Sequence, residues 1–151
     1  MTLEAVRAIS VLVVDDDGGD VRLMREALEL SGVTNEIAVV KDGVEAMAFL
    51  RREAPYEDAA RPDLILLDLN LPRKDGREVL AEVKTDESLR TIPIVVLTTS
   101  TAAADIRRSY ELHANLYVTK PVDLSSFLRV VQEIDQFFVT VVRLPPRGTG
   151  A

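Results

Sequence analysis

Cysteine is absent from this chain of 151 residues, histidine occurs once, and acidic residues outnumber basic ones by 25 to 18. Without cysteine, neither disulfides nor thiol chemistry can contribute, and His113 cannot form a zinc site without cysteine partners. The formal net charge of −7, with no basic stripe, argues against nucleic-acid binding, because phosphate backbones are held mostly by Lys and Arg. These absences exclude thiol enzymes, zinc proteins and DNA-binding output domains.

Long apolar runs are also missing. No stretch approaches the roughly 20 apolar residues that a membrane-spanning helix needs. The first ten residues carry an acid early and lack a long apolar segment, so they do not resemble a secretory signal. The composition, 47% hydrophobic and 28% charged, is ordinary for one soluble domain. We therefore expect a cytoplasmic protein without membrane association.

Short apolar runs alternate with segments of helical periodicity, which is typical of β/α units and a parallel sheet. This pattern predicts an α/β fold: a three-layer α/β/α, doubly wound, five-stranded parallel sheet of order 2-1-3-4-5. Asp20 and Asp123 are expected to be helix N-caps. The expected strands are 11–14, 36–40, 64–67, 94–97 and 115–118, and the expected helices are 20–31, 44–53, 76–85, 102–112 and 124–138.

Polar residues that could take part in catalysis or metal binding follow four of the expected strands. Asp15 and Asp16 follow the run VLVV, Asp68 follows LILL, Thr98 follows IVVL, and Lys120 follows LYVT. Ligands of open α/β sheets bind beyond the carboxyl ends of the strands, where the order reverses. The sequence therefore predicts that these side chains form one site.

Asp68 is the candidate nucleophile of this site. A carboxylate can attack a phosphoryl group and form an aspartyl-phosphate. The approach of one anion to another requires a cation, and Asp15 and Asp16 increase that requirement. Clustered carboxylates without Cys or His ligands suit Mg²⁺, which prefers oxygen ligands. The predicted metal ligands are Asp15, Asp16, Asp68 and the backbone carbonyl of Asn70.

The remaining two side chains can neutralise and orient a phosphoryl group. Lys120 supplies a positive charge for one phosphoryl oxygen, and Thr98 can donate a hydrogen bond to another. Each residue of the site also has an ordinary interpretation, such as helix capping or a solvated turn. The hypothesis of a phosphoryl-transfer site depends on all of these residues occurring together at the strand ends. The turn or cap interpretation is preferred for the other acids near these loops, Asp17, Asp20 and Asp75.

The C-terminal segment falls outside the repeating pattern. Residues 139–144 are β-branched and apolar, and Pro145 and Pro146 follow them. An apolar strand at a terminus is a liability unless it is paired. It either packs on its own domain or binds a partner surface, and we favour a second copy of the same chain.

Four motifs resemble the response-regulator receiver domain of two-component signalling. They are VLVVDDD (11–17), LILLDLNLPRKDG (64–76), IPIVVLTTS (92–100) and YVTKP (117–121), in the family's order. The resemblance covers roughly residues 8–138. GGDVRLMREAL (18–28), the long loop before Asp63 and the tail FFVTVVRLPP (137–146) resemble the small single-domain response regulators of bacterial and cyanobacterial phytochromes.

This resemblance implies specific roles. A sensor histidine kinase would transfer its phosphoryl group to Asp68, with Mg²⁺ held beside it. The resemblance to phytochrome response regulators implies that this kinase is a phytochrome. Thr98 and Tyr117 would be the switch residues, and Lys120 would pair with the phosphate. Residues 1–138 would form the receiver and 139–151 a homodimerisation arm with a flexible end. The protein would be a phosphoacceptor rather than an enzyme, with at most weak self-phosphorylation and autodephosphorylation.

Three other functions compete with this prediction. A Mg²⁺-dependent aspartate phosphatase normally has a general acid two residues after its nucleophile, where this chain has Asn70, and a cap for which no insertion is large enough. In a flavodoxin-like module, the acidic stretch DDDGGD (15–20) would repel the flavin phosphate. A phosphate-independent dimeric adaptor would make no use of the acidic residues.

Overall fold

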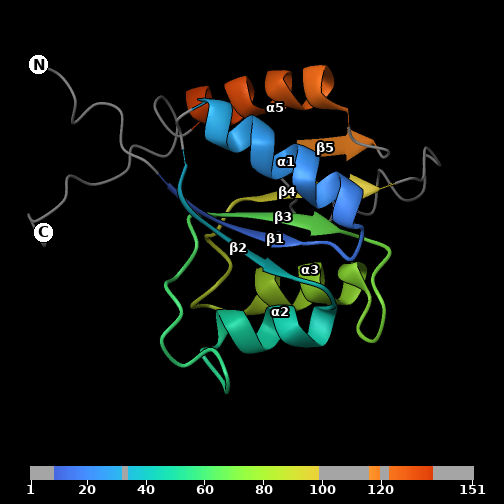
Figure 1. Ribbon diagram of the computed structural model, residues 1–151. Helices are drawn as coiled ribbons and strands as arrows, with labels where there is room; N and C mark the ends of the chain where they lie inside the picture. Colours follow the sequence, from blue (N-terminus) through green and yellow to red (C-terminus); the bar gives the residue numbers. More distant parts are fainter. Residues whose placement is uncertain (1–8, 32–33, 99–115, 120–122, 138–151) are drawn as a thin grey trace, which may run out of the picture.

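A computed structural model describes residues 9–31, 34–98, 116–119 and 123–137 (Figure 1). They form a five-stranded parallel sheet in the order β2-β1-β3-β4-β5. The predicted fold class and strand order are therefore confirmed. The strands are β1 (Ile9–Val14), β2 (Thr34–Val40), β3 (Leu64–Asp68), β4 (Ile94–Thr98) and β5 (Leu116–Thr119).

Helices cover both faces of this sheet, with α1 and α5 on one face and α2 and α3 on the other (Figure 1). The predicted helix over 102–112 and the C-terminal segment 139–151 lie outside the described residues. No helix in the described part of the chain is long and apolar enough to cross a membrane. The helices are α1 (Gly18–Ser31), α2 (Gly43–Leu50), α3 (Gly76–Thr85) and α5 (Leu124–Phe137).

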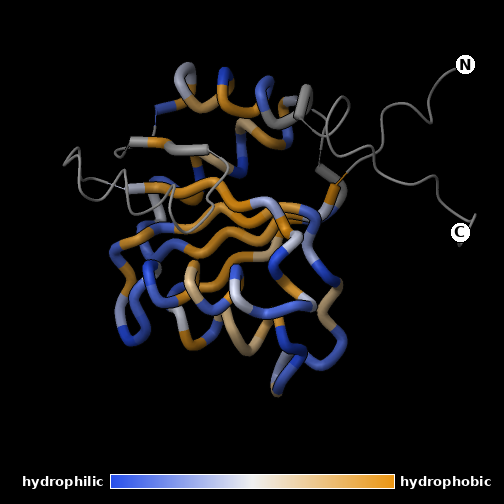
Figure 2. Tube along the Cα trace, turned by 180° about the vertical axis from the view of Figure 1, so that it is seen from behind, coloured by the Kyte–Doolittle hydropathy of each residue, from blue (hydrophilic) through white to orange (hydrophobic). Residues whose placement is uncertain are grey.

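Alternation along the central strands divides the core into two halves. In β1, Val11 and Val13 pack with α1 and α5, whereas Leu12 and Val14 pack with α2 and α3. Because strand side chains alternate between faces, a strand that is covered on both sides reads as a continuous apolar run. Figure 2 shows the result as apolar strands in the interior and polar loops outside.

Capping residues fix where the helices begin. Asp123 caps α5, since its Oδ1 accepts a hydrogen bond from the backbone N–H of Ser126 (2.8 Å), as predicted. The prediction that Asp20 caps the first helix was wrong. Oδ1 of Asp17 accepts from the N–H of Asp20 (3.0 Å), so α1 begins at Gly18 and Asp20 lies in its first turn. The run of acids held several candidate caps, and only the backbone path selects one.

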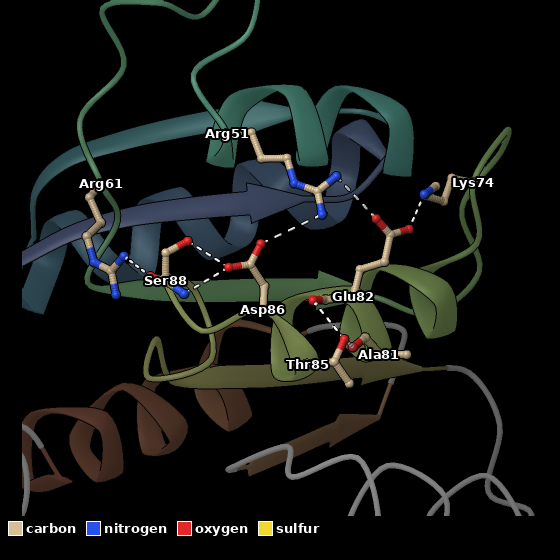
Figure 3. Close-up of polar contacts among 8 residues, drawn as sticks. All are labelled: Arg51, Arg61, Lys74, Ala81, Glu82, Thr85, Asp86 and Ser88. Carbon is tan, nitrogen blue, oxygen red and sulfur yellow. Dashed lines mark hydrogen bonds and ion pairs between the residues drawn. The ribbon is translucent and has the colours of Figure 1, made fainter.

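A polar network ties the outer surface of α2 and α3 to the loops beside them (Figure 3). The Arg51 guanidinium, at the end of α2, lies 3.4 Å from a Glu82 carboxylate oxygen and 3.8 Å from one of Asp86. Hydrogen bonds from Ser88 lower the pKa of the Asp86 carboxyl. Solvent screens such exposed pairs, so this network positions loops more than it stabilises the core.

Gly76 permits the close approach of α3 to the end of β3. A Cβ at Gly76 would lie 2.1 Å from the carbonyl oxygen of Asp68, whereas one at Gly18 would meet nothing within 4 Å. We expect Gly76→Ala to lower the free energy of unfolding by about 1–3 kcal/mol, as overpacking does. The matched Gly18→Ala should leave it unchanged or raise it by up to about 1 kcal/mol. Urea unfolding followed by circular dichroism measures both, and equal stability of the two variants would contradict the steric argument.

Candidate functional site

The site begins where the two central strands end. Val14 of β1 pairs with Leu67 of β3, and the next residues along the chain are Asp15 and Asp68. Carboxylate oxygens of Asp15, Asp16 and Asp68 all lie within 4.8 Å of one another. Asp15 and Asp68 are only 1% and 2% exposed, while Asp16 is exposed to solvent. The structure therefore brings together the three acids that the sequence singled out.

Both buried carboxylates are oriented by the backbone that follows them. Oδ1 of Asp15 accepts a hydrogen bond from the N–H of Asp17 (2.9 Å), and Oδ1 of Asp68 accepts one from the N–H of Asn70 (2.9 Å). Such Asx turns are a standard way for an aspartate to hold its own loop. Each turn fixes one oxygen of its carboxylate and so determines the direction of the other.

Thr98 lies at the same edge of the sheet. Asp68 pairs with Leu97 on β4, so Thr98 is one residue further along the neighbouring strand, and it is fully buried. Tyr117 pairs with Val96 through β5, but its side chain is outside the described residues. Lys120 also lies outside them, directly after Thr119, which pairs with Thr98. The structure thus positions Thr98 and leaves the roles of Lys120 and Tyr117 as predictions.

Electrostatics makes this cluster a candidate cation site. Three carboxylates within 4.8 Å repel one another, and two of them are almost completely removed from water. Burying charge is costly unless it is paired or bound to a metal. Oxygen-only ligands suit hard divalent cations such as Mg²⁺ and Mn²⁺. The donor set fits such an ion, and Asp16 is the exposed member of the set.

Sequence reasoning missed the residues that hold the loop between β3 and α3. Gly43 and Gly76 lie close to its backbone, since a Cβ at Gly43 would be 2.2 Å from the carbonyl oxygen of Lys74. Asp42 and Arg73 form an ion pair of 3.2 Å that joins this loop to α2. The glycines that open α2 and α3 are visible in the sequence, but nothing local indicates which backbone each of them approaches.

Comparison with known proteins agrees with this geometry. The family model for the response regulator receiver domain matches residues 11–132. Response regulator Rcp1 of Synechocystis sp. is 50% identical over 135 residues, which cover 89% of this chain and 92% of that protein.

Two solved structures extend the comparison. The phosphorylated cyanobacterial phytochrome response regulator RcpA is 51% identical and superimposes with a TM-score of 0.81, covering 91% of this chain and 99% of RcpA. The Mn²⁺-bound form of Rcp1 is 49% identical, with a TM-score of 0.79 and the same coverage.

The family match includes the strand ends that carry the acidic cluster and extends through β5 into α5. Rcp1 and RcpA are similar to this chain along nearly their whole length, so the similarity concerns the complete domain and not a shared motif. Strand order, buried aspartates and sequence identity lead to the same assignment. This chain belongs to the response regulator receiver domain family and is a response regulator of two-component signalling, homologous to the phytochrome response regulators.

Proposed function

We propose that Asp68 accepts a phosphoryl group from a phosphohistidine of a sensor kinase. A carboxylate oxygen of Asp68 would attack the phosphorus atom as the bond to the histidine nitrogen breaks, and the nitrogen would leave with the electron pair. The observation that carries this proposal is the position of Asp68, buried at the end of β3 within 4.8 Å of Asp15 and Asp16.

The other residues of the site would hold charge and geometry. Asp15, Asp16, Asp68 and the carbonyl of Asn70 would hold the metal, for which we propose Mg²⁺. When bound, Mg²⁺ neutralises charge on the phosphoryl oxygens. The hydrogen bond from the N–H of Asn70 to Oδ1 of Asp68 would keep the carboxylate oriented during the transfer. Lys120 would pair with another phosphoryl oxygen after transfer.

Thr98 and Tyr117 would convert phosphorylation into a conformational change. Thr98 is buried on the strand next to Asp68, so its hydroxyl would turn toward a new phosphoryl oxygen. Tyr117 belongs to β5, which pairs with β4 at Val96. A ligand shifts a two-state equilibrium only through different interactions with the two states, and these residues would supply that difference.

A phytochrome kinase is the proposed donor, supported by the similarity to RcpA and Rcp1. We also propose that residues 139–151 form an arm that joins two copies of the chain, supported by their apolar, β-branched composition. The receiver would serve as phosphoacceptor with at most weak self-phosphorylation and autodephosphorylation, in the cytoplasm. The phosphate-independent adaptor is the alternative that the first experiment separates.

Intact-protein mass spectrometry after incubation with acetyl phosphate tests the phosphoacceptor. We expect the mass to rise by one phosphoryl group when Mg²⁺ is present and to stay unchanged in Asp68→Asn. The matched control is Asp63→Asn, at the opposite end of β3, where an amide oxygen can still accept the hydrogen bond from the N–H of Ser10. No gain in the unmodified protein would favour the adaptor, and labelling of Asp68→Asn would move the site elsewhere.

Mn²⁺ binding measured by electron paramagnetic resonance, with Mg²⁺ as competitor, tests the metal site separately. Asp16 is exposed, so Asp16→Asn should fold normally and weaken Mn²⁺ binding by about tenfold or more, because loss of even a second-shell partner costs that much. Asp58→Asn removes the same charge from an exposed loop and should leave the affinity unchanged. Equal affinities for the two variants would remove Asp16 from the ligand set.

Thr98→Ala should preserve labelling of Asp68 but reduce the phosphorylation-dependent change in β4 and β5. The reason is that the variant leaves the acidic cluster in place and removes the hydroxyl, together with the γ-methyl group that Thr98→Ser also lacks. Amide chemical shifts recorded with and without acetyl phosphate and Mg²⁺ would show the effect. Thr98→Ser keeps the hydroxyl and should retain the response, so a full response in Thr98→Ala would exclude Thr98 as the switch.

A further inference from the structure

The loop between β3 and α3 carries Asn70. An ion pair joins the middle of this loop to the start of α2, outside the acidic cluster. Nη1 of Arg73 lies 3.2 Å from Oδ2 of Asp42, the residue that precedes α2. Asp42 is only 6% exposed and also caps α2, because its Oδ1 accepts a hydrogen bond from the N–H of Glu45 (2.8 Å). One oxygen therefore holds the helix and the other holds the loop.

Two contacts and an unusual backbone conformation indicate that this loop is closely held. Gly43, the first residue of α2, leaves no room for a Cβ beside the carbonyl oxygen of Lys74. The Lys74 ammonium pairs with Glu82 of α3. Arg73 itself has a φ of 65°, a left-handed conformation that side chains other than glycine seldom adopt. Such a conformation persists only where surrounding contacts enforce it.

Both ends of the same loop touch Asp68 or its neighbour. At one end, the N–H of Asn70 donates to Oδ1 of Asp68 (2.9 Å). At the other end, the N–H of Gly76 donates to the carbonyl oxygen of Leu69 (3.0 Å), and Gly76 lies against the Asp68 carbonyl. The middle of this short segment is therefore linked through a few residues of backbone to Asn70 and to the contacts around Asp68.

We propose that Arg73 and Asp42 are positioning residues for metal binding and phosphoryl acceptance. They act through the β3–α3 loop, by keeping the backbone of Asn70 at the distance and angle that Asp68 requires. This inference rests on the proposed function, since it concerns how well the same site is preorganised. The Arg73 side chain is 60% exposed, so its ion pair adds little to global stability and can be removed without unfolding the domain.

Loss of the Arg73 charge can either strengthen or weaken cation binding, and the direction of this change distinguishes loop positioning from simple electrostatics. Removing a positive charge near an acidic site should strengthen cation binding through the field alone. Releasing the loop should weaken it, because the ligand atoms are no longer held in place. The test compares Arg73→Gln with Arg77→Gln. Arg77 is a neighbouring cation at the start of α3. It pairs with Asp75 (3.3 Å), the residue before that helix, and this ion pair does not join the loop to α2.

We expect Arg73→Gln to weaken Mn²⁺ binding by about tenfold and to raise the Mg²⁺ concentration for half-maximal labelling by acetyl phosphate by a similar factor. Arg77→Gln should leave both unchanged or make binding slightly tighter. Arg73→Lys, which keeps the charge, should restore part of the affinity. Asp42→Asn, which keeps a capping oxygen, should reproduce the loss seen in Arg73→Gln. Urea unfolding should show unchanged stability for the two arginine variants.

The outcomes distinguish the two proposals. If the unmodified protein binds no Mn²⁺ and gains no phosphoryl group, the proposed function fails and this inference fails with it. If the unmodified protein is active and Arg73→Gln behaves like Arg77→Gln, only the positioning role is overturned. A loss of affinity that follows a matching loss of unfolding free energy would also overturn it, since the effect would then be one of stability.

Discussion

The parallel pairing of β1 with β3 at the centre of the sheet is the constraint on which the site depends. This pairing sets the register that ends both strands together, so Asp15 and Asp68 emerge side by side. Close carboxylates repel one another when they are charged, whereas burial of apolar side chains on both faces of the sheet favours folding. The proposed cation would offset the repulsion within the acidic cluster.

The acidic cluster also explains why the surrounding backbone is so closely packed. A phosphoryl acceptor must present one carboxylate oxygen in a defined direction. Asx turns after Asp15 and Asp68 achieve this on the two strands, and Gly76 brings α3 against the end of β3. Because glycine has no Cβ, helix and strand backbones meet there directly. The site is therefore built from main-chain contacts as much as from side chains.

Membership of the receiver family and similarity to phytochrome response regulators place this chain in signalling. The chemistry it needs is modest, because the donor supplies the activated phosphoryl group and the receiver supplies charge and position. The structure adds a feature that the family assignment does not contain. The ion pair between Asp42 and Arg73 joins the β3–α3 loop to the start of α2, so a helix outside the acidic cluster has a physical connection to the site.

The amino-acid sequence by itself determined the fold class, the strand order and the candidate acids, because apolar runs and strand-end aspartates are local patterns. It did not determine the cap of α1, since several aspartates in a row could serve and only the backbone path chose Asp17 over Asp20. It also concealed the partners of Gly43, Gly76 and Arg73. These contacts join residues that lie far apart in the chain or in different elements, so only the tertiary structure decided them.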